Sequence, residues 1–269
     1  MTQAAMAIGK RPSIPLSRIV LPTEHGSWSF LFEPIVVGLA VAFSAAAPWI
    51  ALMAVGAFFA RQPLKTAFLA KRNKGVSSAA MKFAAIFGAA AAVGAVGAAL
   101  TDGPWVFYPF AVAAPLAIQQ IFLDLSTRGR SLLAEITGAV AISSTIAAMA
   151  LAGGLGWPAA VGLWSVFVCR FIPSILYVRD RLNLEKGKPF DRVGAIGSHV
   201  ISLAVVVGLA VFGFASWLTV GVFAFLAARC IYGLSEYRVK MRAMQIGVWE
   251  VIYGAVTVIS IICGYYVGF

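Results

Sequence analysis

The chain has 269 residues, of which 61% are hydrophobic and only 12% are charged, and its mean hydropathy is +0.91. A soluble domain carries roughly 25% charged residues, so this composition excludes a soluble enzyme, a disordered chain and a coiled coil. The formal net charge of +11 would suggest a nucleic-acid partner in a soluble protein, but here it accompanies long apolar runs. We therefore predict an integral membrane protein.

The start of the chain, residues 1–18, is polar and basic and lacks the apolar core of a signal peptide. We expect residues 1–26 to be a cytoplasmic basic segment, followed by a single transmembrane domain over 27–269. The three cysteines, Cys169, Cys230 and Cys263, lie inside apolar runs with no C-x-x-C spacing. They are therefore expected to be buried free thiols, with no disulfide and no metal site.

Nine apolar runs reach the length of about 20 residues that a transmembrane helix needs. In chain order they are 28–47, 49–69, 81–100, 105–123, 132–153, 157–178, 193–215, 217–234 and 244–267. Five of them begin with tryptophan, the residue that favours membrane interfaces, and the second is interrupted by Arg61, Gln62, Pro63 and Lys65. The runs predict an all-α polytopic fold with nine transmembrane helices.

The basic residues fall on one side of this topology. All 21 Lys and Arg residues lie before the first run or around the connections that follow the second, fourth, sixth and eighth runs. The positive-inside rule then predicts a cytoplasmic N-terminus and, with nine spans, an external C-terminus. The net charge is explained by this topology and by attraction to anionic headgroups, so the expected partners include membrane lipids and exclude nucleic acid.

Polar side chains inside the predicted helices lie at similar depths, roughly 10 Å below the cytoplasmic face. Such residues usually face a bundle interior or a wet cavity, although each one alone is also explained as a structural ion pair or a snorkelling side chain. We predict a polar cavity open to the cytoplasm for an anionic or amphipathic small molecule. Its predicted substrate-binding residues are Arg61, Gln62, Lys65, Gln119, Asp124, Glu135, Arg170, Arg179, His199 and Arg229. Its predicted catalytic, proton-exchanging residues are Glu24, His25, Glu33 and Glu250.

A weak internal repeat links the second and sixth runs. In both, aromatic residues precede an arginine and a proline follows it, at 58–63 and at 166–173. This similarity favours two four-helix halves plus a ninth helix, with chance similarity between apolar helices as the alternative.

The densest polar motif is Pro-Thr-Glu-His-Gly-Ser-Trp at 22–28, where His25 could exchange protons at the membrane surface. The simpler interpretation is a helix start with an interfacial tryptophan. This motif, the following apolar helix with Pro34, and Arg-Gln-Pro-Leu at 61–64 resemble the YwiC-like family of bacterial membrane proteins. The resemblance implies a bacterial cytoplasmic (inner) membrane and no particular activity.

The architecture, with nine helices and large cytoplasmic loops after the second and sixth, resembles the UbiA prenyltransferases. That resemblance implies acidic clusters near those two loops that hold Mg²⁺ and an isoprenyl diphosphate. The second cluster is kept in part, which makes Asp180 and Asp191 the candidate metal ligands. The first is missing, because no acidic residue occurs between Pro34 and Thr101.

The sequence leaves several function classes open. One is a UbiA-like transferase or lipid-modifying enzyme that acts on an anionic or isoprenoid-like substrate, with or without Mg²⁺. Another is a proton-coupled transporter, for which intramembrane Glu and His residues are typical, although the external half of the predicted helices carries only Asp102. A non-catalytic accessory protein is the third.

Overall fold

The computed structural model describes residues 27–70, 73–126 and 131–268, and the fold is given for these residues. Within them the chain forms α-helices and no strand. The helices are α2 (Ser27–Val41), α3 (Ala47–Leu69), α4 (Lys74–Asp102), α5 (Tyr108–Leu125), α6 (Leu132–Ala152), α7 (Gly156–Glu185), α8 (Arg192–Val211), α9 (Trp217–Gly233) and α10 (Ala243–Val267), with a 3-10 helix η1 (Pro104–Phe107) before α5. The predicted all-α class is confirmed, and each of the nine apolar runs overlaps one of these α-helices.

Six segments are long and apolar enough to cross a membrane, namely α4, η1 with α5, α6, α7, α8 and α10. The helices α2 and α9 are apolar but shorter. The remaining helix, α3, carries Arg61 and Lys65 within its 23 residues. These lengths and compositions support a membrane protein, whereas a count of nine crossings stays a prediction.

Two helix boundaries differ from the prediction in ways that matter for the site. The first helix ends at Val41 rather than at residue 47, because Ala46 and Pro48 already start α3 and proline favours a first helical turn. The helix predicted over 157–178 continues to Glu185, since neither glycine nor proline occurs between Pro173 and Gly187, whose φ is +64°. Asp180 therefore lies on a helix and not in a loop.

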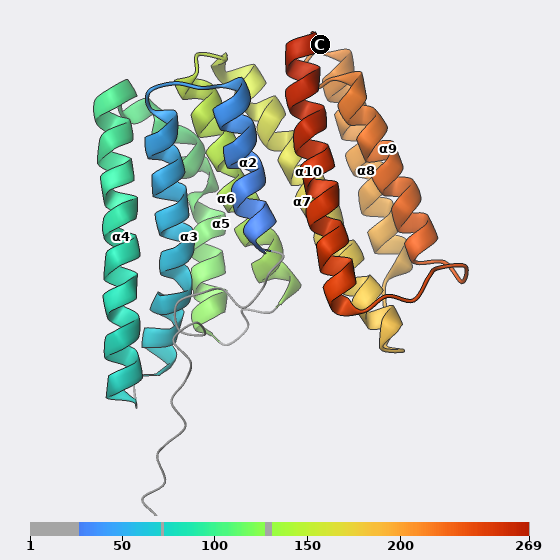
Figure 1. The fold of residues 1–269 in the computed structure, drawn as a ribbon, viewed down its shortest axis with the longest axis horizontal. Coiled ribbons are helices and arrows are strands. Elements are labelled where there is room, and N and C mark those ends of the chain that lie inside the picture. The colour runs from blue at the N-terminus through green and yellow to red at the C-terminus, as the bar shows by residue number, and fades with distance from the viewer. Residues whose placement is uncertain (1–26, 71–72, 127–130, 269) are drawn as a thin grey trace, which may run out of the picture.

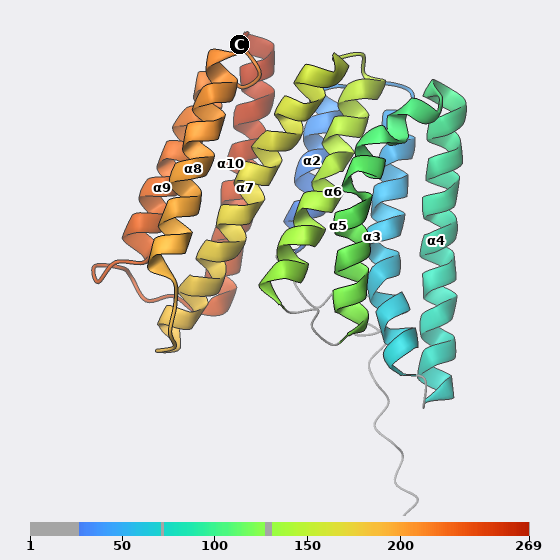
Figure 2. The same ribbon diagram turned by 180° about the vertical axis from the view of Figure 1, so that it is seen from behind.

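The helices form two groups in space, α2–α6 and α7–α10 (Figures 1 and 2). The groups meet where α6 packs on α7 and α2 packs on α10. Val37 of α2, Ile146 of α6, Phe167 and Phe171 of α7, and Val258 of α10 are buried together in one core cluster. The groups therefore share a continuous apolar core, and α10 packs against α2 as well as against α9.

The connection between the two groups is short and rich in glycine. Only three residues separate α6 from α7, and Gly154 and Gly156 have φ values of +79° and +75°. Glycine adopts such left-handed conformations without the steric penalty that a Cβ brings. The chain can therefore reverse direction at this point within very few residues.

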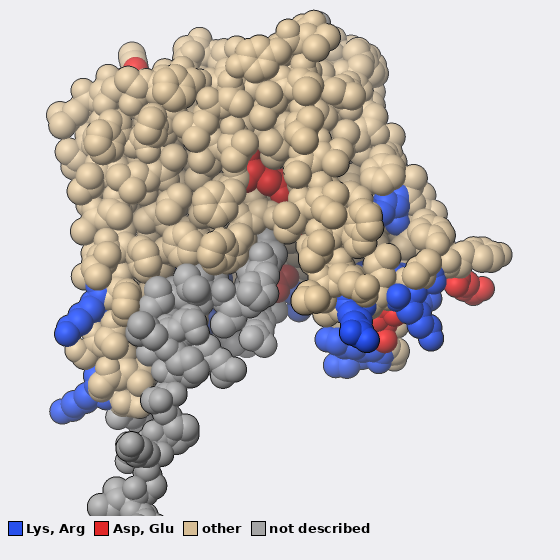
Figure 3. All heavy atoms as spheres, in the orientation of Figure 1, with Lys and Arg blue, Asp and Glu red and all other residues tan. Residues whose placement is uncertain are grey.

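Charge is distributed unevenly over the described surface. Figure 3 shows that Lys and Arg atoms gather at the end of the molecule opposite the marked C-terminus of Figure 1. This is the asymmetry that the sequence predicted from the positions of the basic residues.

The helices α3 and α4 pack backbone against backbone through glycines. A Cβ on Gly94 would meet backbone atoms of Trp49 and Met53, and a Cβ on Gly56 would meet backbone atoms of Phe87 and Ala91. Small residues at helix contacts permit this close approach in membrane proteins.

We predict that Gly94→Ala lowers the thermal stability of the purified protein. The added methyl group would force α3 and α4 apart, and overpacking of this kind costs about 1–3 kcal/mol. Gly88→Ala on the same helix is the matched control, because its Cβ would meet nothing within 4 Å. Thermal unfolding in detergent measures both variants, and equal melting temperatures would contradict the close packing.

Candidate functional site

A buried carboxylate on α10 joins three helices of the second group. Arg229 of α9 donates from Nη1 to Oε1 of Glu250, and the Ser174 hydroxyl of α7 donates to Oε2. Arg170 of α7 places Nη1 3.6 Å from Oε2 of Glu250 and donates from Nη2 to the Glu250 backbone oxygen at 3.2 Å. The Arg170 side chain is 3% exposed and that of Glu250 is 12% exposed. One carboxylate therefore compensates two nearly buried guanidinium groups.

Aromatic rings fix the plane of the Arg229 guanidinium. Its central carbon lies 4.0 Å from the centroid of the Tyr177 ring and 4.6 Å from that of Tyr253. Such cation–π contacts are strongest when the cation is removed from water. The Tyr177 ring in turn meets the ring of His199 edge-on, with 6.3 Å between the ring centroids.

His199 of α8 is buried and uses one ring nitrogen within its own helix. Its Nδ1 lies 2.9 Å from the backbone oxygen of Ala195. Because a carbonyl oxygen only accepts hydrogen bonds, Nδ1 carries the hydrogen in this contact. In a neutral ring, Nε2 is then the nitrogen able to accept a proton.

Glu33 brings a second acid to the same place from the other helix group. It is 7% exposed, and a Cβ on Gly254 of α10 would meet its carboxylate, so it packs against α10 one turn beyond Glu250. Its Oε2 is buried and, within the part of the chain that the structure describes, has no hydrogen-bond partner. Figure 3 shows acidic atoms on the front face between the positions of α2 and α10.

We call this arrangement the Glu250 cluster. It consists of Glu33, Arg170, Ser174, Tyr177, His199, Arg229, Glu250 and Tyr253, from α2, α7, α8, α9 and α10. Of its members, Ser174, Tyr177 and Tyr253 were not predicted. Their spacing could have indicated them, because Ser174 follows Arg170 by four residues, and Tyr253 follows Glu250 by three, so each lies on the same helix face as a predicted residue.

The two acids of the cluster lie six and seven residues from the starts of α2 and α10, at the spacing that the sequence predicted. Glu33 is eight residues before Val41, about 12 Å from the outer end of α2 at 1.5 Å per residue. Glu250 is seven residues after Ala243, about 10 Å from the other end of its own helix. Glu33 therefore lies near the middle of the short helix α2, whereas Glu250 lies in the first third of α10.

Two of the cations predicted to bind an anionic substrate instead compensate another buried acid, Asp124 of α5. Arg61 donates from Nε and from Nη2 to the two oxygens of Asp124, the second bond measuring 3.1 Å. Lys65 places its Nζ 3.5 Å from Oδ1 of the same carboxylate. Since Asp124 is only 2% exposed, these contacts stabilise the packing of α3 against α5.

The glutamine side chains near these residues lie in different environments. Gln62 is half-buried beside Arg61, and its backbone oxygen accepts a hydrogen bond from Thr66. Gln119 is exposed on α5, whereas Gln120 packs against Gly138 of α6. The structure therefore does not bring Gln119 to either buried acid.

The remaining predicted residues lie at the connections between helices. Glu135 of α6 pairs with Arg179 of α7 at 3.3 Å, with the two side chains 31% and 40% exposed. Asp180 accepts a hydrogen bond from the backbone nitrogen of Asp191 at 3.1 Å, and Asp191 caps α8 through the backbone nitrogen of Gly194 at 2.9 Å. These contacts stabilise the α7–α8 junction.

The metal assignment of Asp180 and Asp191 stays a prediction. In the described part of the chain, no group of three or more His, Cys, Asp and Glu side chains could hold a metal ion. Both carboxylates also accept backbone hydrogen bonds, so no step below is derived through a metal. The other two predicted residues, Glu24 and His25, lie outside the described residues.

The C-terminal end of α7 is tied to the C-terminal end of α9. Arg181 is 2% exposed and donates to the backbone oxygens of Gly233 and Val239. It also pairs with Glu185 at 2.9 Å. These charge-assisted bonds hold α7, α9 and the segment that leads to α10 together.

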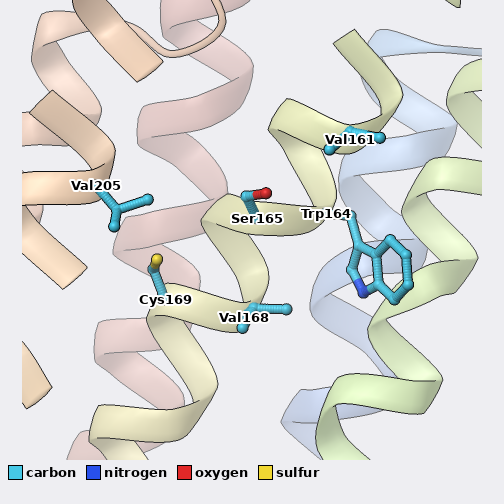
Figure 4. A pocket seen from close by; sticks show the side chains of 6 residues that line it. All are labelled: Val161, Trp164, Ser165, Val168, Cys169 and Val205. Carbon is cyan, nitrogen blue, oxygen red and sulfur yellow. The ribbon is translucent and has the colours of Figure 1, made fainter. Parts of the chain in front are cut away.

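An open apolar groove of about 400 Å³ lies along α7 and α8 (Figure 4). Its lining residues are Val161, Trp164, Ser165, Val168, Cys169 and Val205. The indole nitrogen of Trp164 donates to Val140 at 3.2 Å and to Ser143 at 3.0 Å, which leaves an apolar ring surface for the groove. The groove and the Glu250 cluster both use α7, where Cys169 of the groove immediately precedes Arg170 of the cluster.

Comparison with known proteins identifies one family. The model described as YwiC-like protein matches residues 21–152. The match covers the described helices α2–α6, with Glu33, Arg61 and Asp124, and ends before α7. No curated protein and no solved structure matches the chain.

We predict that Glu250→Gln strongly destabilises the protein. The change removes the carboxylate charge that pairs with Arg170 and Arg229, and removal of one partner from a buried pair costs about 3–5 kcal/mol. Glu135→Gln makes the same chemical change in the more exposed pair with Arg179, where the cost should be about 1 kcal/mol or less. Thermal unfolding in detergent distinguishes the two, and a Glu250→Gln variant as stable as Glu135→Gln would refute this view of the cluster.

Proposed function

Residues 21–152 of the chain match the YwiC-like family, and we propose that the protein is a membrane carrier that couples the movement of a small molecule to that of protons. One observation carries the proposal. Glu33, an acid of the first helix group with a buried and unpartnered oxygen, faces the arginine–glutamate pairs of the second group. Ionisable residues within a bilayer are typical of proton pathways in pumps and transporters.

Protonation of Glu33 would change the charge balance between the two groups. When Glu33 is ionised, two carboxylates offset Arg170 and Arg229, and the attraction between Glu33 and Arg170 holds α2 against α7 and α10. When Glu33 is protonated, this attraction is lost and one positive charge is in excess. The proton thereby favours a different arrangement of the groups, which is how a ligand shifts a conformational equilibrium.

The place of the cluster, where the two helix groups meet, supports a carrier more than its depth does. The bare external half of the helices weighs against a carrier, because cargo must reach the site from both sides. Glu33, however, lies only about 12 Å from the outer end of α2. A midplane site between two helix groups is the usual arrangement in secondary transporters.

The proposed topology has nine crossings, a cytoplasmic N-terminus and an external C-terminus in a bacterial inner membrane. The end of the molecule that carries the Lys and Arg atoms in Figure 3 would face the cytoplasm, as the positive-inside rule requires. In this topology α2, α3 and α9 also cross the membrane, although they are shorter or more polar than the other helices.

We predict that Glu33→Gln slows proton movement at least tenfold. Glutamine keeps the size and polarity of the side chain but cannot exchange a proton. The measurement is acidification of the interior of vesicles that contain the purified protein and a pH-sensitive dye. Formate, acetate, phosphate, sodium and potassium are added to the vesicles in turn. Glu236→Gln, an exposed acid between α9 and α10, is the control and should behave as the wild type. A Glu33→Gln variant as fast as the wild type, or a wild type inert to every solute, would overturn the proposal.

The second candidate is a UbiA-like transferase or lipid-modifying enzyme built from two four-helix halves and a ninth helix. The apolar groove along α7 and α8 favours it, because an isoprenoid-like chain could lie there with its anionic end toward Arg179. The two functions use different surfaces, so they are separable by mutation.

We predict that Ser165→Trp, which fills the groove (Figure 4), leaves vesicle acidification unchanged. A carrier that works through the Glu250 cluster does not need the groove. The same variant should abolish transfer of an isoprenoid group if the protein is an enzyme, as measured with radiolabelled isoprenyl diphosphate in membranes. Transfer activity that the variant loses would therefore favour the second candidate.

A further inference from the structure

The guanidinium edge formed by Nε and Nη2 has hydrogen-bond acceptors in Arg61 but, among the described residues, none in Arg229. The Nε and Nη2 nitrogens of Arg61 hold the two oxygens of Asp124, the bidentate geometry that suits a carboxylate. In Arg229 only Nη1 has an acceptor, on Glu250. Its Nε and Nη2 are buried and have no hydrogen-bond partner among the described residues, although they form the same edge of the guanidinium.

The unpartnered edge of Arg229 is held in place. The side chain is 8% exposed and lies between the rings of Tyr177 and Tyr253, so the guanidinium cannot rotate toward water without losing both stacking contacts. Arg170 adds another buried nitrogen without a partner, its Nε. A buried donor without an acceptor costs folding free energy. Several such donors held in fixed positions therefore indicate a binding site for an acceptor.

The charge of the cluster points to an anionic acceptor. With Glu33 protonated, only Glu250 offsets Arg170 and Arg229. The other members from α7–α10, Ser174, Tyr177, His199 and Tyr253, supply no further carboxylate. The helices α3 and α6, which also pack against α2, direct their charged side chains elsewhere, because Arg61 and Lys65 contact Asp124 and Glu135 contacts Arg179.

We propose that the Nε–Nη2 edge of Arg229 binds a small oxyanion, a carboxylate or an inorganic oxyanion, that moves together with a proton on Glu33. This inference rests on the proposed carrier function and names its class of cargo. Two parallel N–H groups favour an ion with two adjacent oxygens over a spherical halide. The burial of Arg229 favours a free ion over the headgroup of a lipid, which stays attached to its chains.

The test measures binding separately from transport. The purified full-length protein, in nanodiscs of zwitterionic lipid, is titrated with sodium formate, sodium phosphate and sodium chloride while its melting temperature is followed, since a ligand of the folded state raises that temperature. Formate or phosphate should stabilise the protein at concentrations where chloride does not. Equal stabilisation by chloride would overturn the inference.

The matched variants are Arg229→Lys and Arg61→Lys. Lysine keeps the charge but lacks the two-donor edge, so Arg229→Lys should weaken oxyanion binding about tenfold or more. Arg61→Lys loses an edge that Asp124 already occupies and should bind oxyanions as the wild type does. If Arg229→Lys does not fold, Tyr253→Leu serves instead, because it removes one stacking ring and should also weaken binding. Unchanged affinity in the folded variant would overturn the inference.

Two further outcomes separate the ligand from the transport activity. Nanodiscs with anionic phospholipid that abolish the effect of formate would identify a lipid headgroup as the ligand and overturn the free-ion assignment. Formate binding without oxyanion-driven acidification would refute the carrier and leave the binding site. Acidification that is equally fast with oxyanions and with chloride would refute the oxyanion assignment and leave the carrier.

Discussion

A charge within a bilayer must be compensated within the protein, and this constraint organises the structure. Glu250 receives Arg229, Arg170 and the Ser174 hydroxyl because none of these groups can be hydrated at low cost at this depth. The contacts tie α7, α9 and α10 into one group, and Glu33 extends them to α2. The same interactions thus hold the helices together and create the place where a proton or an anion would act.

The two buried acids, Asp124 and Glu250, differ in how completely they satisfy the arginines that contact them. Asp124 satisfies both donors on one edge of Arg61 and also contacts Lys65, so this contact works as a structural pair. Glu250 accepts a hydrogen bond only from Nη1 of Arg229. The contacts with the Tyr177 and Tyr253 rings keep the guanidinium from rotating toward another acceptor. Equivalent residue types therefore produce a closed contact in one helix group and an incomplete one in the other.

Hydropathy predicted the helices well, because a bilayer imposes a minimum apolar length that can be counted along the chain. It placed the ends of α2 and α7 wrongly. The end of α2 depends on Pro48 in the first turn of α3, and the end of α7 depends on Gly187 and on the polar but helix-compatible residues before it. Residue type also indicated Glu33, Arg170, Arg229 and Glu250 as functional candidates. It could not tell which acid each cation meets, because depth along a helix says nothing of the facing helix, and so the contact of Arg61 and Lys65 with Asp124 was not predicted.

The anchoring of Arg181 on the carbonyls of Gly233 and Val239 bears on how such a protein would move. With its far end fastened to α9 and its centre fastened to α10 through Arg170, α7 cannot slide independently of its neighbours. The second group would then rotate as a rigid body. The hinge would be the three-residue link between α6 and α7, because Gly154 in the link and Gly156 at the start of α7 tolerate large torsional changes. Stiffening this link would thus slow the rotation while leaving every charged contact of the cluster intact.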